Sequence, residues 1–181
     1  KFGSELIDDV PFIRSLGLAP DNVVKFIYPY EGNAAAVGLD YRLVPGQWPS
    51  VKKAMEGRSS ILSGPVETVQ GERYLMVRVP VLPPAYPKQP ITERPYWGLA
   101  TLVLDETGLF QAAGLSERAD GYRFAIISSQ QSASGPALIF GDSELVHADA
   151  VSLPLVLPGD NKWEILGYPV GGWSTVGKEV W

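Results

Sequence analysis

Hydrophobic and polar residues alternate along the stretch YLMVRVPVL, which runs from Tyr74 to Leu82. Successive side chains on a β-strand point to opposite faces, so a period of two predicts a strand. One face is uniformly aliphatic and consists of Leu75, Val77, Val79 and Val81. The other face consists of Tyr74, Met76, Arg78 and Pro80. The pattern therefore places a permanently charged guanidinium at the centre of a strand face, where it needs a partner.

Two helices are predicted before this strand. Residues 4–13 form the first, which Ser4 can cap and Pro11 ends or bends. Residues 47–57 form the second, with a proline in its first turn, apolar residues at helical spacing and a glycine at its end. This second helix is expected to pack on one face of the sheet that contains Tyr74–Val81.

Most of the remaining chain predicts antiparallel strands. Residues 13–19 and 22–29 suit a hairpin around Ala-Pro-Asp-Asn, and residues 59–70 lead into Tyr74–Leu82 through a connection that contains Gly71. Additional strands are expected over residues 96–106, 122–128 and 135–142 and on both sides of the turn 158–161. The connections and short helices are expected at 31–43, 83–95, 107–115 and 129–135. This order of elements is typical of an α+β fold with mainly antiparallel pairing.

Composition narrows the class of protein. The chain has 181 residues, of which 45% are hydrophobic and 19% are charged, so it can bury a sizeable core. Its net charge of −5 and its lack of a basic run make nucleic acid a poor partner. The chain has no cysteine, which excludes disulfides and thiolate metal sites.

Signatures of catalysis and metal binding are scarce. The single histidine, His147, cannot form an imidazole-rich metal site, and no serine lies in a Gly-x-Ser-x-Gly elbow. The sequence also lacks a phosphate-binding Gly-Lys-Ser/Thr loop. We therefore expect no catalytic residue, no metal site and no cofactor, and we interpret the chain as a binding domain.

Five segments, in order, resemble bacterial CHASE domains. These segments are IYPYEGNAAAVGLDY, ILSGPVETVQG, RVPVL, YWGLATLVLDETGLFQAAGL and LPGDNKWEILGYPVGGW, and the resemblance extends from about Ile7 to Trp173. CHASE domains are extracytoplasmic sensory modules of transmembrane histidine kinases and cyclases, and plant cytokinin receptors carry a related module. One departure is an extra residue in the stretch GRSSILSGP, which is expected to alter the edge of the pocket.

The resemblance implies an architecture and a location. It implies a stalk helix, truncated here, followed by a membrane-distal PAS-like lobe over 1–115 and a membrane-proximal PAS-like lobe over 116–181. The parent protein is then expected to be an inner-membrane receptor with its sensor in the periplasm, to form a homodimer, and to carry a histidine kinase or diguanylate cyclase output. The chain starts without methionine, and we interpret it as an excised piece whose isolated form is a monomer or a weak dimer.

Arg78 is the main candidate for ligand binding. Its partner is either a protein carboxylate, with Glu67 and Asp40 as candidates, or an acidic group of a ligand held by the planar guanidinium. The resemblance favours the ligand, because the matching strand of CHASE domains lines the ligand cavity. The full set of expected ligand-binding residues is Arg78, Tyr74, Met76, Ser63, Trp48, Tyr96 and Asp40.

We therefore predict a sensory domain that binds a small, anionic molecule in its N-terminal lobe. Two alternatives remain open from the residues alone. The first is a sensor lobe that binds no ligand and serves as a dimerisation spacer. The second is an unrelated secreted β-rich domain that binds carbohydrate or acts as an enzyme.

Overall fold

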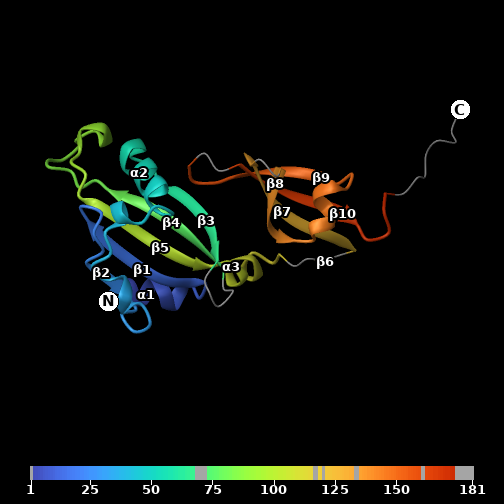
Figure 1. Cartoon of the computed structure of the whole chain (residues 1–181), viewed down its shortest axis with the longest axis horizontal. Coiled ribbons are helices and arrows are strands. Elements are labelled where there is room, and N and C mark those ends of the chain that lie inside the picture. Colours follow the sequence, from blue (N-terminus) through green and yellow to red (C-terminus); the bar gives the residue numbers. More distant parts are fainter. Residues whose placement is uncertain are drawn as a thin grey trace, which may run out of the picture. The chain divides into compact units, whose positions relative to one another are not determined.

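The computed structural model describes residues 2–67, 73–115, 118–119, 121–132, 135–159 and 162–173. The chain divides into two compact units, Lys1–Leu109 and Phe110–Trp181, each built around an antiparallel sheet (Figure 1). The prediction of an α+β fold with mainly antiparallel pairing is confirmed. No helix in the described part of the chain is long and apolar enough to cross a membrane.

The first unit contains a five-stranded sheet with the strand order β2-β1-β5-β4-β3. Its strands are β1 (Ile13–Pro20), β2 (Phe26–Tyr28), β3 (Ile61–Glu67), β4 (Arg73–Val81) and β5 (Gly98–Asp105). Its α-helices are α1 (Phe2–Asp9) and α2 (Trp48–Gly57), and short 3-10 helices lie at Ala34–Ala36, Tyr41–Leu43 and Ile91–Glu93. The predicted hairpins β1–β2 and β3–β4 are both present. The connection around Gly71 lies outside the described residues.

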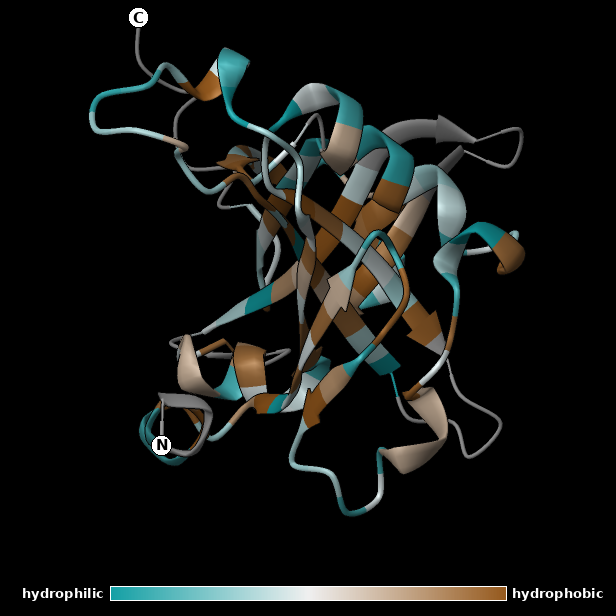
Figure 2. Ribbon diagram, turned by 90° about the vertical axis from the view of Figure 1, so that its left-hand side faces the viewer, coloured by the Kyte–Doolittle hydropathy of each residue, from teal (hydrophilic) through white to brown (hydrophobic). Residues whose placement is uncertain are grey.

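Helix α2 packs over β3, β4 and β5, as the spacing of its apolar residues predicts. Val51 and Ala54 are fully buried and join a core cluster with residues of β1, β3 and β5. The helix ends at Gly57, as predicted, and Arg58 after it adopts a left-handed conformation. Hydrophobic residues concentrate in the strands, whereas the helices and loops carry more polar residues (Figure 2).

The aliphatic face of β4 is covered only in part. Leu75 is fully buried, but Val79 is 36% exposed, whereas Arg78 on the opposite face is only 1% exposed. Arg78 is therefore one of the most buried residues of this strand, although charged residues are usually more exposed than aliphatic ones.

A β-bulge interrupts β3 between Ser63 and Val66. Gly64 adopts a φ of +109° there, and a Cβ at this position would lie 2.8 Å from the carbonyl oxygen of Tyr74 on β4. The bulge therefore needs glycine at this point, and it falls within the stretch in which the sequence departs from the usual CHASE spacing.

The second unit contains β6 (Arg118–Ala119), β7 (Tyr122–Ser132), β8 (Gly135–Gly141), β9 (Val151–Val156) and β10 (Lys162–Pro169). The strand order is β6-β7-β10-β9, with β8 paired to β7. Helix α3 (Glu106–Ala112) precedes these strands, and a 3-10 helix lies at Ser143–His147. The connection predicted at 129–135 is shorter than expected, because backbone pairing continues along β7 to Ser132, opposite Gly135. Residues 160–161 of the predicted turn lie outside the described residues.

Gly98 lies so close to the neighbouring strand that a larger residue is expected to lower stability. Its φ is +157°, and a Cβ here would overlap the backbone carbonyl of Ala19 on the neighbouring strand β1. We expect Gly98→Ala to lower the free energy of unfolding by about 2–5 kcal/mol, because overpacking and backbone strain add. Urea unfolding measures this loss. The matched control is Gly46→Ala, since a Cβ at Gly46 meets nothing within 4 Å, and an equal effect of both variants would contradict the prediction.

Candidate functional site

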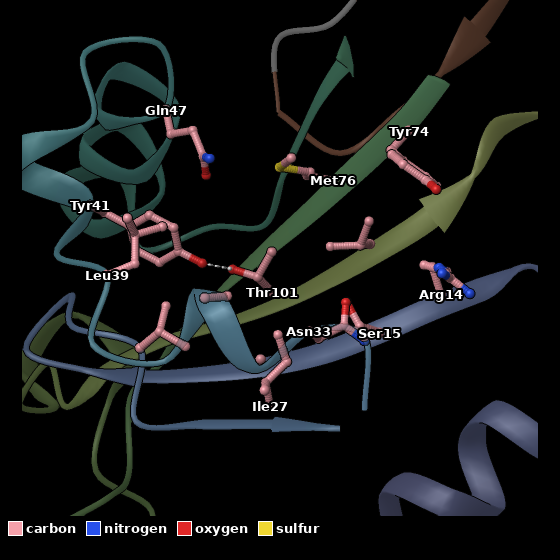
Figure 3. Close-up of a pocket in the computed structure, with 15 residues that line it drawn as sticks. Arg14, Ser15, Ile27, Asn33, Leu39, Tyr41, Gln47, Tyr74, Met76 and Thr101 are labelled. Atoms are coloured by element: carbon pink, nitrogen blue, oxygen red, sulfur yellow. Dashed lines mark hydrogen bonds between the residues drawn. The ribbon is translucent and has the colours of Figure 1, made fainter. Parts of the chain in front are cut away.

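A cavity of about 350 Å³ lies against one face of the first unit's sheet (Figure 3). The strands β1, β4 and β5 supply one wall, and the other lining residues come from β2, from Val24 before it and from the segment between β2 and α2. The lining residues are Arg14, Ser15, Gly17, Val24, Ile27, Gly32, Asn33, Ala36, Leu39, Tyr41, Gln47, Tyr74, Met76, Thr101 and Val103. The volume is at the lower end of the range of small-molecule sites.

Strand register explains why these side chains share one face. Thr101 of β5 lies opposite Gly17 of β1 and opposite Arg78 of β4. The next row on the same face contains Ser15, Val103 and Met76. Side chains two residues apart on a strand point to the same side, so the even-numbered face of β4 and the matching residues of β1 and β5 are directed to the cavity wall.

Arg78 lies behind this wall and contacts four residues that line the cavity. Its Nη2 donates to Gln47 Oε1 at 2.8 Å and to Met76 Sδ at 3.2 Å, and its Nη1 donates to Thr101 Oγ1 at 3.5 Å. Its guanidinium carbon lies 5.0 Å from the centre of the Tyr41 ring, within range of a cation–π interaction. A further bond, from Nε to Ser50 Oγ at 2.9 Å, ties the strand to the first turn of α2.

All of these partners are neutral. Within the described residues, Arg78 forms no ion pair. Burial lowers the pKa of the Arg78 guanidinium, and the neighbouring Tyr41 hydroxyl partly opposes this shift. A buried ion carries a desolvation penalty of about several kcal/mol, which neutral hydrogen bonds and a ring face offset only in part.

The guanidinium also orients the groups around it. Arginine can only donate, so Gln47 must present its Oε1 to Arg78, which leaves the Nε2 donors of that amide without a partner in the described structure. Thr101 Oγ1 accepts from Arg78, and it also accepts from the Tyr41 hydroxyl at 3.4 Å (Figure 3). This end of the cavity is therefore rich in hydrogen-bond donors.

The residues expected from the sequence fall into two groups. Tyr74 and Met76 line the cavity, and Arg78 contacts its wall as described above. Ser63 lies beside this wall, and its hydroxyl donates to the backbone oxygen of Met76 at 3.3 Å. Strand alternation along β4 accounts for Tyr74, Met76 and Arg78, whereas Ser63 reaches this wall through the pairing of β3 with β4.

The other three expected residues do not line the cavity. Trp48 packs against the core cluster beneath α2, and the Tyr96 hydroxyl donates to Asn22 Oδ1 at 2.6 Å. Burial, with the charge of Asp21, raises the pKa of Tyr96 to about 12. None of the three residues is part of the described cavity lining.

Asp40 is not the partner of Arg78. Its carboxylate accepts from Arg42 Nε at 2.8 Å and from Arg42 Nη2 at 2.9 Å, and it caps the 3-10 helix at Tyr41–Leu43. The hydrogen bond from Arg42 lowers the pKa of Asp40. The side chain of Glu67, the other candidate partner, lies outside the described residues.

Sequence reasoning missed several lining residues, chiefly Arg14, Tyr41, Gln47 and Thr101. Two of them carried a local signal. Arg14 is the one charged residue in the predicted strand 13–19, and Gln47 is the first residue of the predicted helix, where its side chain can reach back to the sheet. The described residues contain no group of three or more side chains suited to hold a metal ion.

Solved structures with a similar fold are extracellular sensor domains. An extracellular ligand-binding receptor from Desulfohalobium retbaense has a TM-score of 0.59 at 9% identity over 91% of this chain, which spans only 32% of that receptor. The ligand-binding domain of the Pseudomonas aeruginosa amino-acid chemoreceptor PctC, in complex with GABA, has a TM-score of 0.54 at 16% identity over 87% of this chain and 74% of that domain. The extracellular domain of a putative histidine kinase has a TM-score of 0.50 at 17% identity over 93% of this chain and 74% of that domain.

The family of the chain follows from its sequence. No curated protein is significantly similar to it. The CHASE domain model matches residues 13–140, which include all of β1–β5 and the whole lining of the cavity. The chain belongs to the CHASE-domain family.

Proposed function

We propose that this chain is the extracytoplasmic sensory domain of a transmembrane signalling receptor and that a small molecule binds in the cavity of the first unit. The observation that carries this proposal is the cavity itself, which has mixed apolar and polar walls and a donor-rich end backed by a buried arginine. Membership of the CHASE family supports it. The PctC domain, which has a similar fold, holds GABA, and this supports a ligand of small size.

Binding fits this cavity better than catalysis does. General acid–base chemistry needs a group that can lose and regain a proton near neutral pH, usually a histidine or a carboxyl group. The described lining of the cavity contains neither. Its polar groups are instead amide, hydroxyl and guanidinium groups, which recognise a ligand by hydrogen bonds.

The ligand is expected to present an acidic group to the donor-rich end. Gln47, Thr101 and Tyr41 would contact this group, and the charge of Arg78 behind them would stabilise it. Tyr74 and Met76 would form the side wall. Ser63, Trp48, Tyr96 and Asp40 would support the site through the contacts described above rather than touch the ligand.

The architecture of the parent protein is part of the proposal. Helix α1 would be the end of a stalk, and two PAS-like lobes, over residues 1–115 and 116–181, would follow it. The receptor would form a homodimer in the inner membrane, with this domain in the periplasm and a histidine kinase or diguanylate cyclase output in the cytoplasm. Ligand binding would act by shifting an equilibrium between two arrangements of the sensor.

A ligand screen tests the proposal. We expect at least one compound in a library of small metabolites to raise the melting temperature, since a ligand at 100 times its Kd adds about 2.7 kcal/mol of stability. The double variant Gln47→Leu/Thr101→Val is the control, and its response to the same compound should be lost. A domain that binds no compound, and that co-purifies with none by mass spectrometry, would instead be a spacer.

Arg78 provides a second test. We expect Arg78→Met to change the free energy of unfolding of the ligand-free protein by less than about 1.5 kcal/mol, because the variant loses hydrogen bonds but also removes an uncompensated buried charge. The same variant should weaken binding of the compound found in the screen by about tenfold to a hundredfold. Urea unfolding and calorimetry measure the two effects.

The matched control for this test is Arg42→Met, which removes an exposed arginine that pairs with Asp40. It should leave both stability and binding nearly unchanged, as is usual for surface ion pairs. A loss of about 3–5 kcal/mol in Arg78→Met with unchanged affinity would mean that Arg78 neutralises a buried protein carboxylate, and the assignment of its role would be wrong.

A further inference from the structure

We infer that the ligand carries a second acidic group and that Arg14 binds this group at the end of the cavity opposite the donor-rich end. This inference rests on the proposed function, because it specifies the ligand class of the same cavity. The ligand would be a short molecule with a carboxylate or a similar acid at each end. Arg14 would then be a residue that determines specificity, beyond the site built around Arg78.

Arg14 is an exposed cation for which the described residues provide no side-chain partner. It forms no hydrogen bond or ion pair with side chains in the described part of the chain. The pairing of β1 with β5 shifts register between Ile13 and Ser15, so Arg14 occupies a bulge. Bulges redirect a side chain relative to the regular alternation of a strand, and here both Arg14 and its neighbour Ser15 line the cavity.

Arg14 also borders a second cavity. This cavity measures about 510 Å³ and is lined by Ile7, Pro11, Ile13, Arg14, Pro29, Tyr74 and Asp105. Arg14 and Tyr74 line both cavities. Figure 3 shows Arg14 beside Tyr74 and Ser15, away from the end where Gln47, Tyr41 and Thr101 lie. A ligand therefore has space on both sides of this guanidinium.

The distribution of charge in the first cavity favours a dianion. Its described lining contains Arg14 and no carboxylate, and the second cation, Arg78, lies directly behind the opposite end. The chain as a whole carries a net charge of −5, so the positive charge in and directly behind this cavity differs in sign from the average of the chain. Unpaired guanidinium groups in a partly enclosed space raise the local concentration of anions.

The strand register sets the length of the ligand. Arg78 and Gly17 both lie opposite Thr101, and Arg14 precedes Gly17 by three residues on β1. Three residues of a strand span roughly 10 Å. Arg14 lines the cavity and Arg78 lies behind its opposite end, so the two acidic groups would be separated by several carbon atoms rather than by one.

One carboxylate competes with this assignment. Asp105 lines the second cavity together with Arg14, and its Oδ2 accepts from the backbone nitrogen of Gly108 at 2.7 Å. A ligand whose far end reached Asp105 would carry an ammonium group there instead of an acid. The experiment must therefore separate a diacid from an amino acid of the same length.

Calorimetric titration with four compounds of one chain length makes this separation. The compounds are hexanedioate, hexanoate, 6-aminohexanoate and 1,6-hexanediol, and butanedioate and octanedioate test the length. We expect the best diacid to bind about tenfold to a hundredfold more tightly than hexanoate. Arg14→Gln should reduce the affinity for the diacid to that for hexanoate and leave hexanoate unchanged, whereas Arg78→Met should weaken both.

Three results would overturn the inference. Equal affinity for the diacid and hexanoate in the unmodified protein would remove the second acid site. An equal loss for both compounds in Arg14→Gln would show general attraction rather than a contact with one end. Tightest binding of 6-aminohexanoate, abolished by Asp105→Asn, would assign the far end to Asp105.

Absence of binding by all six compounds at millimolar concentration would also overturn the diacid class. The proposed function would survive that result if the library screen finds another ligand, and it would fail only if the screen finds none. An exposed control, Arg42→Gln, should leave all affinities unchanged. The two hypotheses therefore fail on different measurements.

Discussion

The first unit depends on a single constraint: a guanidinium buried at the centre of its sheet without a carboxylate among the described residues. Arg78 can only donate hydrogen bonds, so each element packed above β4 must supply an acceptor or a ring face. Helix α2 supplies Ser50, the residue before it supplies Gln47, strand β5 supplies Thr101, and the 3-10 helix at Tyr41–Leu43 supplies an aromatic ring. The segment between β2 and α2 is therefore held over the sheet by polar contacts, which are directional, together with apolar packing.

This arrangement gives a physical link between binding and conformation. Tyr41 belongs both to the cation–π contact with Arg78 and to the buried core cluster with Val51 and Leu99. An anion at the donor-rich end would offset part of the desolvation cost of the guanidinium, and it would do so only while Tyr41 and Gln47 remain in place. In the proposed function, a ligand would therefore stabilise the covered arrangement more than any arrangement in which the segment between β2 and α2 has moved away.

Patterns within one segment predicted much of the fold and part of the site. The period of two along β4 was enough to place Tyr74, Met76 and Arg78 on one face, and helical spacing with a proline and a glycine defined α2 within one residue. Contacts between segments that are distant in the sequence could not be predicted from such local patterns. Asp40 could have paired with Arg78 or with Arg42. It pairs with Arg42, which is only two residues away and therefore reaches the carboxylate at a much smaller cost in chain entropy. Tyr96 was likewise expected at the ligand, but its hydroxyl is used to satisfy the buried Asn22.

The net charge of the chain does not predict the charge at the cavity. A net charge of −5 averages over the whole chain and says little about a space bordered by fifteen residues. Three acidic groups of the first unit are used in short-range contacts: Asp40 and Glu106 pair with Arg42 and Arg73, and the carboxylate of Asp105 accepts a backbone hydrogen bond beside α3. Each ion pair neutralises one cation and one anion, and Arg14 and Arg78 form no ion pair with the described residues. In the proposed function, the charge that a ligand would meet is therefore set by Arg14 in the described lining and by Arg78 behind it, and that charge has the opposite sign to that of the chain.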